Sequence, residues 1–167
     1  TWDVRVWAAA GSKPDCWLID LTSIQRCATD SPLELDEYRY GGLGYRGPKE
    51  WKDESYELLT SEGKTKANGH ATRAKWCANS GRADGRWSTI VFLGHPTNHE
   101  FPEPMRIWAE GGAFFNFAPV QAGPRTLEPG KTYAFRYRML VHEGRIDRDL
   151  AERAWQDFAQ PPRATLE

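Results

Sequence analysis

The clearest hydrophobic pattern in the chain is an alternation of apolar and polar positions from Thr132 to His142. Tyr133, Phe135 and Tyr137 begin a series of apolar residues at every second position, which is the period of a half-buried β-strand. Shorter apolar runs, rich in aromatic and β-branched residues, predict more strands. These are Asp3–Ala9, Trp17–Cys27, Ala74–Ala78, Ser88–Leu93, Met105–Trp108 and Ala113–Phe117.

One helix is predicted, near the C-terminal end. Asp147 suits an N-cap, the apolar residues Leu150, Ala154 and Phe158 fall on one helical face, and Pro161 ends the pattern. Many short strands with Gly/Pro turns and a single helix are typical of an all-β protein. We therefore expect an antiparallel β-sandwich whose helix covers an edge or an open end.

The length of 167 residues fits one domain, and we expect residues 1–165 to form it. Leu166-Glu167 matches the scar of a common affinity-tag junction. Because the chain opens within a predicted strand, Thr1 to Ala9, missing upstream strands are one alternative for this domain. Such strands would lie in a missing N-terminal segment, and assembly into a homo-oligomer is the other alternative.

Charge and composition narrow the range of partners. The chain has 22 Lys and Arg against 23 Asp and Glu, a net charge of -1, which gives no long-range attraction for a phosphate backbone. We expect no nucleic-acid partner. No apolar run approaches the roughly 20 residues of a membrane helix, so no membrane role is expected. The three cysteines have no CxxC spacing, so we expect small buried residues rather than a zinc site, with one Cys16–Cys27 disulfide as the alternative in an exported protein.

The segment after the apolar strand Ser88–Leu93 is the richest in candidate chemistry. It presents His95, Asn98, Arg106 and Trp108 within fourteen residues, stiffened by three prolines. A stiff polar loop at the end of a sheet is typical of a site for a polar ligand. Structural histidines are the alternative.

The same segment raises the question of a metal. His95, His99 and Glu100 are residue types that bind transition metals. However, a His-x3-His pair shares one face only on a helix, and Pro96 and Pro102 argue against a helix here. We therefore expect no metal and no cofactor.

A second polar segment precedes that one. Within fifteen residues it carries a carboxylate, three cations and an imidazole: Glu62, Lys64, His70, Arg73 and Lys75. Arg73 and Lys75 share one face if the backbone is extended, and two neighbouring cations need an acidic partner or a ligand. Glu62 is the nearest acidic candidate in sequence, although solvated loop charges are an ordinary explanation.

Several motifs in a fixed order resemble the bacterial "PmoA family" of uncharacterised proteins. They are Tyr40-Gly-Gly-Leu-Gly-Tyr-Arg-Gly, Leu59-Thr-Ser-Glu-Gly-Lys-Thr, Arg73-Ala-Lys-Trp, His95-Pro-Thr-Asn, Pro104-Met-Arg-Ile and Phe114-Phe-Asn. The resemblance implies a β-sandwich related to the mutarotase-like sandwiches, a carbohydrate-related ligand and a longer relative with an extra N-terminal β segment. His99 lies outside the pattern. The methane-oxygenase label of that family is not carried over.

The resulting expectation is a protein that binds or transforms a sugar or sugar derivative. As an enzyme, it would use His95 and Glu62 as proton carriers, with Arg106 and Lys75 stabilising negative charge. The ligand would also contact Lys64, His70, Arg73, Asn98 and Trp108. A non-catalytic sugar-binding or accessory module is the first alternative, and a metal-dependent oxygenase is the second.

Overall fold

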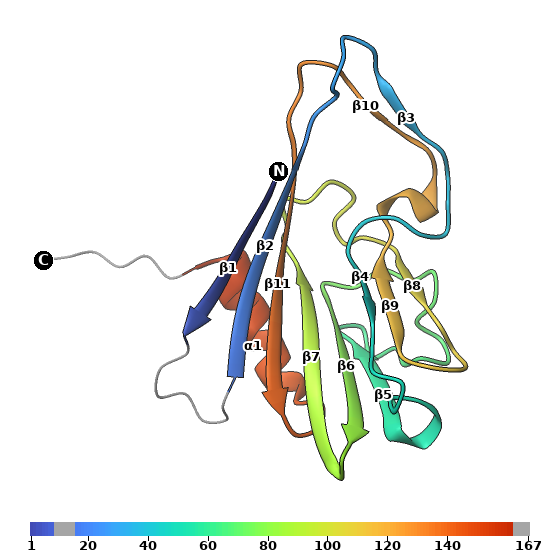
Figure 1. Ribbon diagram of the computed structural model, residues 1–167, viewed down its shortest axis with the longest axis vertical. Coiled ribbons are helices and arrows are strands. Elements are labelled where there is room, and N and C mark those ends of the chain that lie inside the picture. Colours follow the sequence, from blue (N-terminus) through green and yellow to red (C-terminus); the bar gives the residue numbers. More distant parts are fainter. Residues whose placement is uncertain (9–15, 162–167) are drawn as a thin grey trace, which may run out of the picture.

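The computed structural model describes residues 1–8 and 16–161, which form two sheet layers and one α-helix (Figure 1). The expected antiparallel all-β fold with one C-terminal helix is confirmed. Leu166-Glu167 lies outside the described residues. The strands are β1 Trp2–Ala8, β2 Cys16–Gln25, β3 Leu33–Leu35, β4 Gly44–Arg46, β5 Tyr56–Thr60, β6 Trp76–Ala83, β7 Arg86–Gly94, β8 Met105–Ile107, β9 Phe114–Phe117, β10 Arg125–Leu127 and β11 Tyr133–Glu143.

The larger layer is a six-stranded sheet in the order β1-β2-β11-β7-β6-β5. A three-stranded sheet, β4-β9-β8, faces its β5–β7 half, and a separate pair, β3-β10, forms an arm at one end (Figure 1). Two short 3-10 helices, Asp53–Ser55 and Pro119–Ala122, connect strands. The long sheet therefore extends well beyond the small one.

Strand β6 differs from its prediction, Ala74–Ala78, because buried polar residues conceal its pattern. Asn79 and Ser80 are both fully buried. The Tyr56 hydroxyl donates to Asn79 Oδ1 at 2.6 Å, and Thr89 Oγ1 donates to Ser80 Oγ at 2.9 Å. Each buried polar group thus has a partner, which lets the strand continue to Ala83.

The main core lies between the two sheets. Alternate residues of β11, Phe135 and Tyr137, face inward and pack with aromatic side chains of β9. Trp51 is seated on β6 at Gly81, where a Cβ atom would lie 2.2 Å from the indole ring. The buried residues of this core are Trp51, Tyr56, Leu58, Ala74, Cys77, Phe92, Met105, Ile107, Ala113, Phe115, Phe117, Phe135 and Tyr137.

Helix α1, Arg148–Ala159, covers the outer face of the six-stranded sheet rather than an edge or open end. The predicted cap is confirmed, since Asp147 Oδ1 accepts from the Leu150 N–H at 2.9 Å. Trp155 Nε1 donates to the Gly94 carbonyl at 3.0 Å, which anchors the helix at the end of β7. No helix within the described ranges is long and apolar enough to cross a bilayer.

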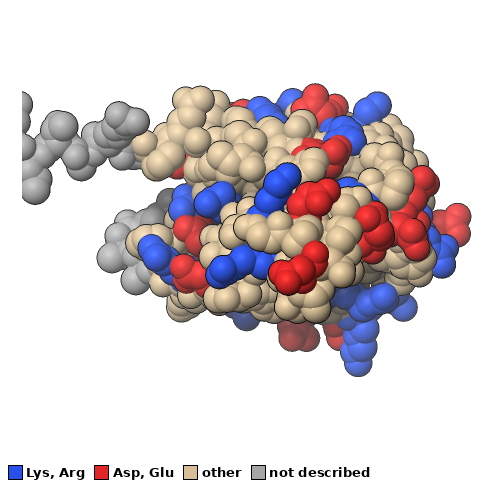
Figure 2. All heavy atoms as spheres, turned by 90° about the horizontal axis from the view of Figure 1, so that it is seen from above, with Lys and Arg blue, Asp and Glu red and all other residues tan. Residues whose placement is uncertain are grey.

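The inner face of the long sheet is covered over only part of its width. The small sheet covers β5, β6 and β7, whereas β1 and β2 extend past it (Figure 1). As a result, Trp2, Val4 and Val6 are 76%, 56% and 60% exposed. Acidic and basic side chains are interspersed over the end of the molecule seen from above (Figure 2), in keeping with the near-zero net charge.

Candidate functional site

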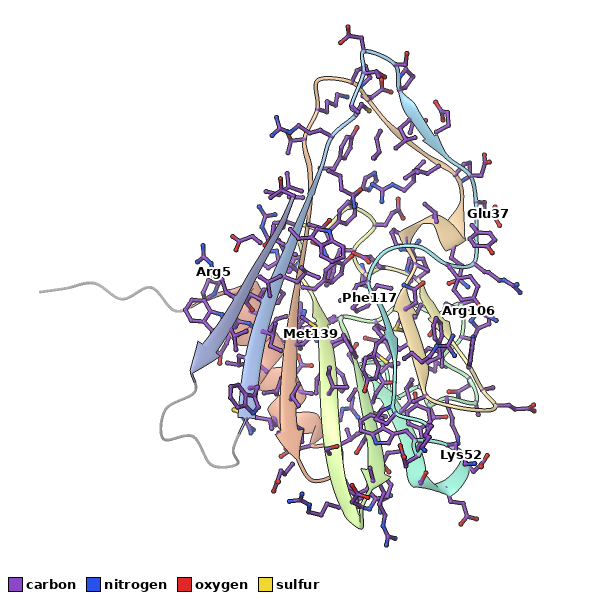
Figure 3. All side chains as sticks on the ribbon, in the orientation of Figure 1. Arg5, Glu37, Lys52, Arg106, Phe117 and Met139 are labelled. Carbon is purple, nitrogen blue, oxygen red and sulfur yellow. The ribbon has the colours of Figure 1, made fainter. Side chains whose placement is uncertain are left out.

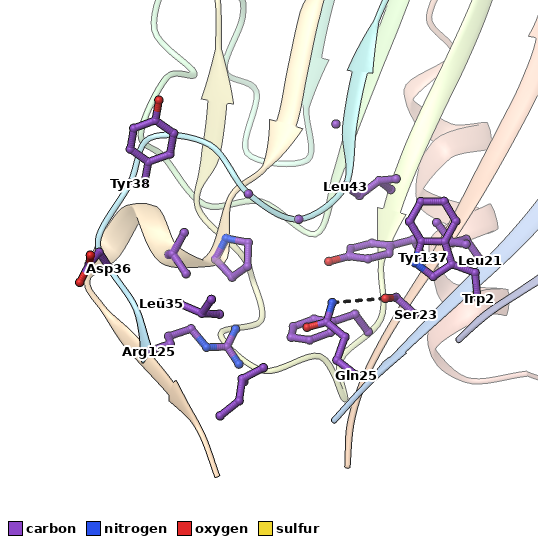
Figure 4. A pocket seen from close by; sticks show the side chains of 17 residues that line it. Trp2, Leu21, Ser23, Gln25, Leu35, Asp36, Tyr38, Leu43, Arg125 and Tyr137 are labelled. Atoms are coloured by element: carbon purple, nitrogen blue, oxygen red, sulfur yellow. Dashed lines mark hydrogen bonds between the residues drawn. The ribbon is translucent and has the colours of Figure 1, made fainter. Parts of the chain in front are cut away.

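A cavity with a volume of about 700 Å³ opens at one end of the small sheet. It lies where the small sheet ends, between the inner face of β2 and β11 and the chain from Leu35 to Gly44 (Figure 4). Its walls are mainly apolar with a few polar groups, as in most small-molecule sites. The residues that line it include Trp2, Ser23, Gln25, Tyr38, Gly42, Arg125 and Tyr137.

The glycine-rich wall of the cavity is held in place by a buried amide. Asn116 is 3% exposed; its Oδ1 accepts from the Gly41 N–H and its Nδ2 donates to the Gly41 carbonyl, both at 3.2 Å. Gly42 has a φ of 89°, and a Cβ there would lie 2.4 Å from the Phe117 carbonyl oxygen. The backbone at Gly42 therefore approaches Phe117 so closely that only glycine fits at this point of the cavity wall.

Arg125 extends from β10 into the cavity, opposite the hydroxyl of Tyr137 (Figure 4). Its guanidinium carbon lies 5.3 Å from the centroid of the Phe135 ring. Its Nε and Nη2 atoms are buried, and among the described residues neither has a hydrogen-bond partner. Burying guanidinium donors without acceptors is costly, so the half-buried Arg125 has donor capacity that the described residues do not use.

Tyr137 connects the cavity to a buried carboxyl group. Its hydroxyl donates to Glu103, with oxygen–oxygen distances of 3.0 and 2.9 Å. Asn98 Nδ2 also donates to Glu103 Oε1 at 3.1 Å. Burial raises the pKa of Glu103 to about 7, although these hydrogen bonds oppose the shift. Burial and the Glu103 charge also raise the pKa of Tyr137. A proton acceptor poised near neutrality thus lies directly behind the cavity wall.

Asn98, predicted as a ligand contact, is used inside the protein instead. It is 5% exposed; its Oδ1 accepts from the Arg136 N–H at 2.7 Å and its Nδ2 donates to the Arg136 carbonyl at 2.9 Å. The Asn98 side-chain amide therefore hydrogen-bonds to the backbone of β11 in the way that a neighbouring strand would. With the Glu103 contact added, it holds the carboxyl in place rather than facing solvent.

His95 lies in a separate groove of about 260 Å³ on the outer face of the sheet. Its ring packs edge-on against Phe158 of α1 with centroids 5.0 Å apart. Its Nδ1 lies 2.8 Å from Thr97 Oγ1, which accepts from Arg136 Nη1 at 3.2 Å. Burial, together with Arg136 and Arg138, lowers the pKa of His95. The other groove residues are Asp3, Arg5, Asp20, Thr22, Arg136 and Tyr137.

Arg106 belongs to a different cluster on the small sheet. Its Nη1 lies 2.9 Å from His70 Nε2, and burial together with the Arg106 charge lowers the pKa of His70. Trp108 stacks on Phe114 with centroids 4.6 Å apart, under the guanidinium of Arg46. Figure 3 shows Arg106 on the opposite side of the molecule from Arg5, which lines the His95 groove. The structure therefore brings together His70, Arg106 and Trp108, but not His95.

The predicted cations have acidic partners, although Glu62 is not among them. Arg73 Nη2 lies 3.2 Å from Glu100 Oε2, and Lys75 Nζ lies 2.7 Å from Glu152 Oε1. Glu62 is exposed and accepts from Ser61 Oγ at 2.9 Å. Expecting Glu62 as the partner was wrong because folding supplies acidic groups distant in sequence.

Two further predicted residues, Lys64 and His99, are exposed. His99 Nδ1 lies 3.7 Å from Glu100 Oε1. Over residues 1–8 and 16–161, no three His, Cys, Asp or Glu side chains gather in a way that could hold a metal ion. His95, Glu62 and Arg106 each have different surroundings, so this arrangement does not support one ligand touching all three.

Comparison with known proteins gives the chain a family. A model described as a family of unknown function (DUF6807) matches residues 1–156. The chain belongs to this family. No curated protein and no solved structure matches the sequence. The description of DUF6807 names no ligand or reaction, and the resemblance to the PmoA family stays a prediction.

The sequence of this DUF6807 protein marks the glycine-rich wall of the cavity through the motif Tyr40-Gly-Gly-Leu-Gly, but it did not predict the polar residues of the cavity. Tyr137 was assigned only to a strand pattern, and Arg125 and Glu103 were not singled out. One signal was present for Glu103, because a carboxylate between Pro102 and Pro104 next to a buried strand is unusual for a solvated loop. No local pattern distinguishes Arg125, since its lack of partners arises from the folded neighbours.

Proposed function

We propose that the cavity beside Tyr137 and Arg125 binds a small ring compound that carries a carboxylate, with sugar acids as the ligand class. The observation that carries the proposal is the pair of buried, unpartnered nitrogens of Arg125 at the wall of a preformed cavity. Planar carboxylates accept two parallel hydrogen bonds from a guanidinium. A carboxylate ligand would therefore supply the acceptors that the described part of the chain does not.

The shape and walls of the cavity favour a ring. A volume of about 700 Å³ is within the range of roughly 300–1,000 Å³ that is typical of small-molecule sites. The exposed side chains of Trp2 and Tyr38 lie at its border and offer flat surfaces for the apolar face of a sugar ring. Ser23 and Gln25, joined by a 3.3 Å hydrogen bond, add groups for ring hydroxyls (Figure 4). The carbohydrate-related resemblance supports the same class.

A second candidate function is acid–base chemistry on the same ligand. It is favoured by the Tyr137–Glu103 pair, in which a carboxyl with a pKa of about 7 accepts from a hydroxyl at the cavity wall. In this reaction the Tyr137 oxygen takes a proton from the ligand carbon next to the carboxylate while its own proton moves to Glu103. Return of the proton from Glu103 through Tyr137 restores the ligand, whereas protonation by water on the opposite face, followed by loss of the proton from Glu103 to solvent, gives the epimer.

Thermal shift and calorimetry with glucuronate and galacturonate, compared with glucose and galactose, test the binding proposal. At about 100 times Kd, a ligand stabilises the fold by about 2.7 kcal/mol. The sugar acids should raise Tm more than the neutral sugars. Arg125→Met should remove this difference, because methionine keeps an apolar side chain but offers no charged donors.

Arg82→Met is the matched control, since Arg82 is an exposed residue of β6 that does not line the cavity. It should keep the preference for the acids. The binding proposal fails if neither acid raises Tm, or if Arg125→Met binds the acids as tightly as the parent protein. In D2O, the same samples report on the second candidate, because ligand proton exchange that Glu103→Gln abolishes supports acid–base chemistry.

A further inference from the structure

Strand β1 leaves one edge of the six-stranded sheet unpaired in the described residues. It pairs only with β2, in the register Trp2–Ser23 to Ala8–Trp17. The opposite edge, β5, is partly covered by its own following turn, since Leu59 bridges to Thr65. An open row of N–H and C=O groups is a template for another strand. Of the two edges, β1 is therefore the better candidate for pairing with another strand.

The hydrogen bonds at Thr1 identify which residues of β1 face outward. The Thr1 amino group donates to the Ile24 carbonyl, and the Ile24 N–H donates to the Thr1 carbonyl, both at 2.8 Å. Such a doubly bonded pair alternates with non-bonded pairs along an antiparallel ladder. Odd-numbered residues of β1 therefore bond to β2. The N–H and C=O groups of Trp2, Val4 and Val6 point away from the sheet.

The side chains of β1 are suited to a strand of the same sequence. Its inner-face residues, Trp2, Val4 and Val6, are apolar and more than half exposed. Its outer face carries one acid and one base, Asp3 and Arg5, two positions apart. Read in opposite directions, two copies of this strand place acid opposite base and apolar opposite apolar.

We propose that β1 pairs antiparallel with β1 of a second copy of the chain, about a twofold axis at Val4. Val4 then forms a hydrogen-bonded pair with Val4 of the second copy, flanked on both sides by Trp2–Val6 pairs. The outward N–H and C=O groups of these three residues supply six backbone hydrogen bonds. Asp3 lies opposite Arg5 of the second copy, at non-hydrogen-bonded positions where side chains approach most closely.

The neighbouring registers are disfavoured by charge. Shifting the pairing by two residues in one direction places Asp3 opposite Asp3 of the second copy, and shifting it the other way places Arg5 opposite Arg5. Like charges directly opposite each other destabilise a strand pair. Shifts by one residue would leave the outward-facing groups out of register. The twofold pairing at Val4 is the register that matches charges and hydrogen bonds together.

Sedimentation of the full chain and of charge-reversed variants tests the proposal. The parent protein should form dimers, and Asp3→Arg and Arg5→Asp should each associate at least about tenfold more weakly, because each reversal creates two like-charged pairs. An equimolar mixture of the two variants should form heterodimers, since its cross-strand pairs are again opposite in charge. The double variant, Asp3→Arg with Arg5→Asp, should dimerise like the parent.

Asp30→Arg makes the same charge change at an exposed loop residue away from β1 and should leave dimerisation unchanged. Heterodimers in the mixture also show that both single variants are folded. The proposal is overturned if the parent protein remains monomeric up to high micromolar concentration. It is equally overturned if the single reversals dimerise as well as the parent, or if the mixture does not dimerise.

Discussion

Glu103 is a carboxyl group whose environment differs strongly from that of a solvated side chain. It is 2% exposed, and it accepts from Tyr137 and Asn98 but forms no ion pair within the described residues. Its pKa of about 7 in the folded state is above the unfolded value of about 4.5. The native state therefore binds the Glu103 proton more tightly than the unfolded state does. The stability that this protonation contributes is complete below about pH 4.5 and is lost as the pH rises through 7.

Glu103→Gln should accordingly flatten the pH dependence of the free energy of unfolding. A shift of this size corresponds to about 3 kcal/mol between pH 4.5 and neutrality, and the parent protein should lose that amount relative to the variant. Urea unfolding at pH 5, 6, 7 and 8 measures it. Glu37→Gln, at an exposed position, is the control and should follow the parent curve. Parallel curves for Glu103→Gln and the parent would contradict the assignment.

Residue identity alone predicts only part of this chemistry. His95 follows an apolar strand and has Thr97 as a polar neighbour, whereas Arg106 lies within β8 beside His70. Their grouping into one site does not follow from sequence, since one faces α1 and the other belongs to the small sheet. The environments of Glu103 and Arg125 depend on burial by segments far away in the chain, and no local pattern encodes them.

At the level of elements, Trp51 packs directly on Gly81 of β6 within the core between the two sheets. A Cβ at Gly81 would lie 2.2 Å from the indole ring, which is itself buried. Gly81→Ala should therefore push the layers apart and destabilise the protein by about 1–3 kcal/mol. Chemical denaturation measures the loss, and near-ultraviolet circular dichroism should show an altered tryptophan environment.

Gly112→Ala provides the matched comparison. Its Cβ would have the Trp51 carbonyl oxygen as its only neighbour, at 3.9 Å, which is ordinary contact. It should change stability by less than about 0.5 kcal/mol. Equal losses in the two variants would mean that the close approach at Gly81 does not position the layers.

The strands that the sequence analysis missed are short, although the three-residue strand β8 was predicted within one residue. Strand β11 and helix α1 have enough residues to display their periods, and both were predicted within one or two residues. Strands β3, β4 and β10 have three residues each, too few for a period of two, and they form because partners distant in sequence pair with them. Strand β5 was missed although its burial alternates through Tyr56, Leu58 and Thr60.

At the scale of the whole molecule, stability should be concentrated on one side of the long sheet. Strand β7 is covered on both faces, by the small sheet through Phe92 and by α1 through Val91. Strand β1 lies beyond both cores, and its large apolar side chains remain exposed. Local opening of β1 therefore breaks few contacts, whereas exchange at β7 requires disruption of the entire core.

Hydrogen exchange followed by NMR should reveal this gradient in Asp3→Arg, where β1 is expected to stay unpaired. The amide of Arg5 faces β2 and that of Val91 lies in the centre of the sheet, so both are hydrogen-bonded and differ mainly in their surroundings. Arg5 should exchange at least about a hundredfold faster, equal to about 3 kcal/mol in opening free energy. In the parent protein at high concentration, pairing of β1 with a second copy should slow exchange at Arg5 and so bring its rate closer to that of Val91. Similar exchange at Arg5 and Val91 in the dilute variant would mean that the sheet opens as one unit, despite its half-covered inner face.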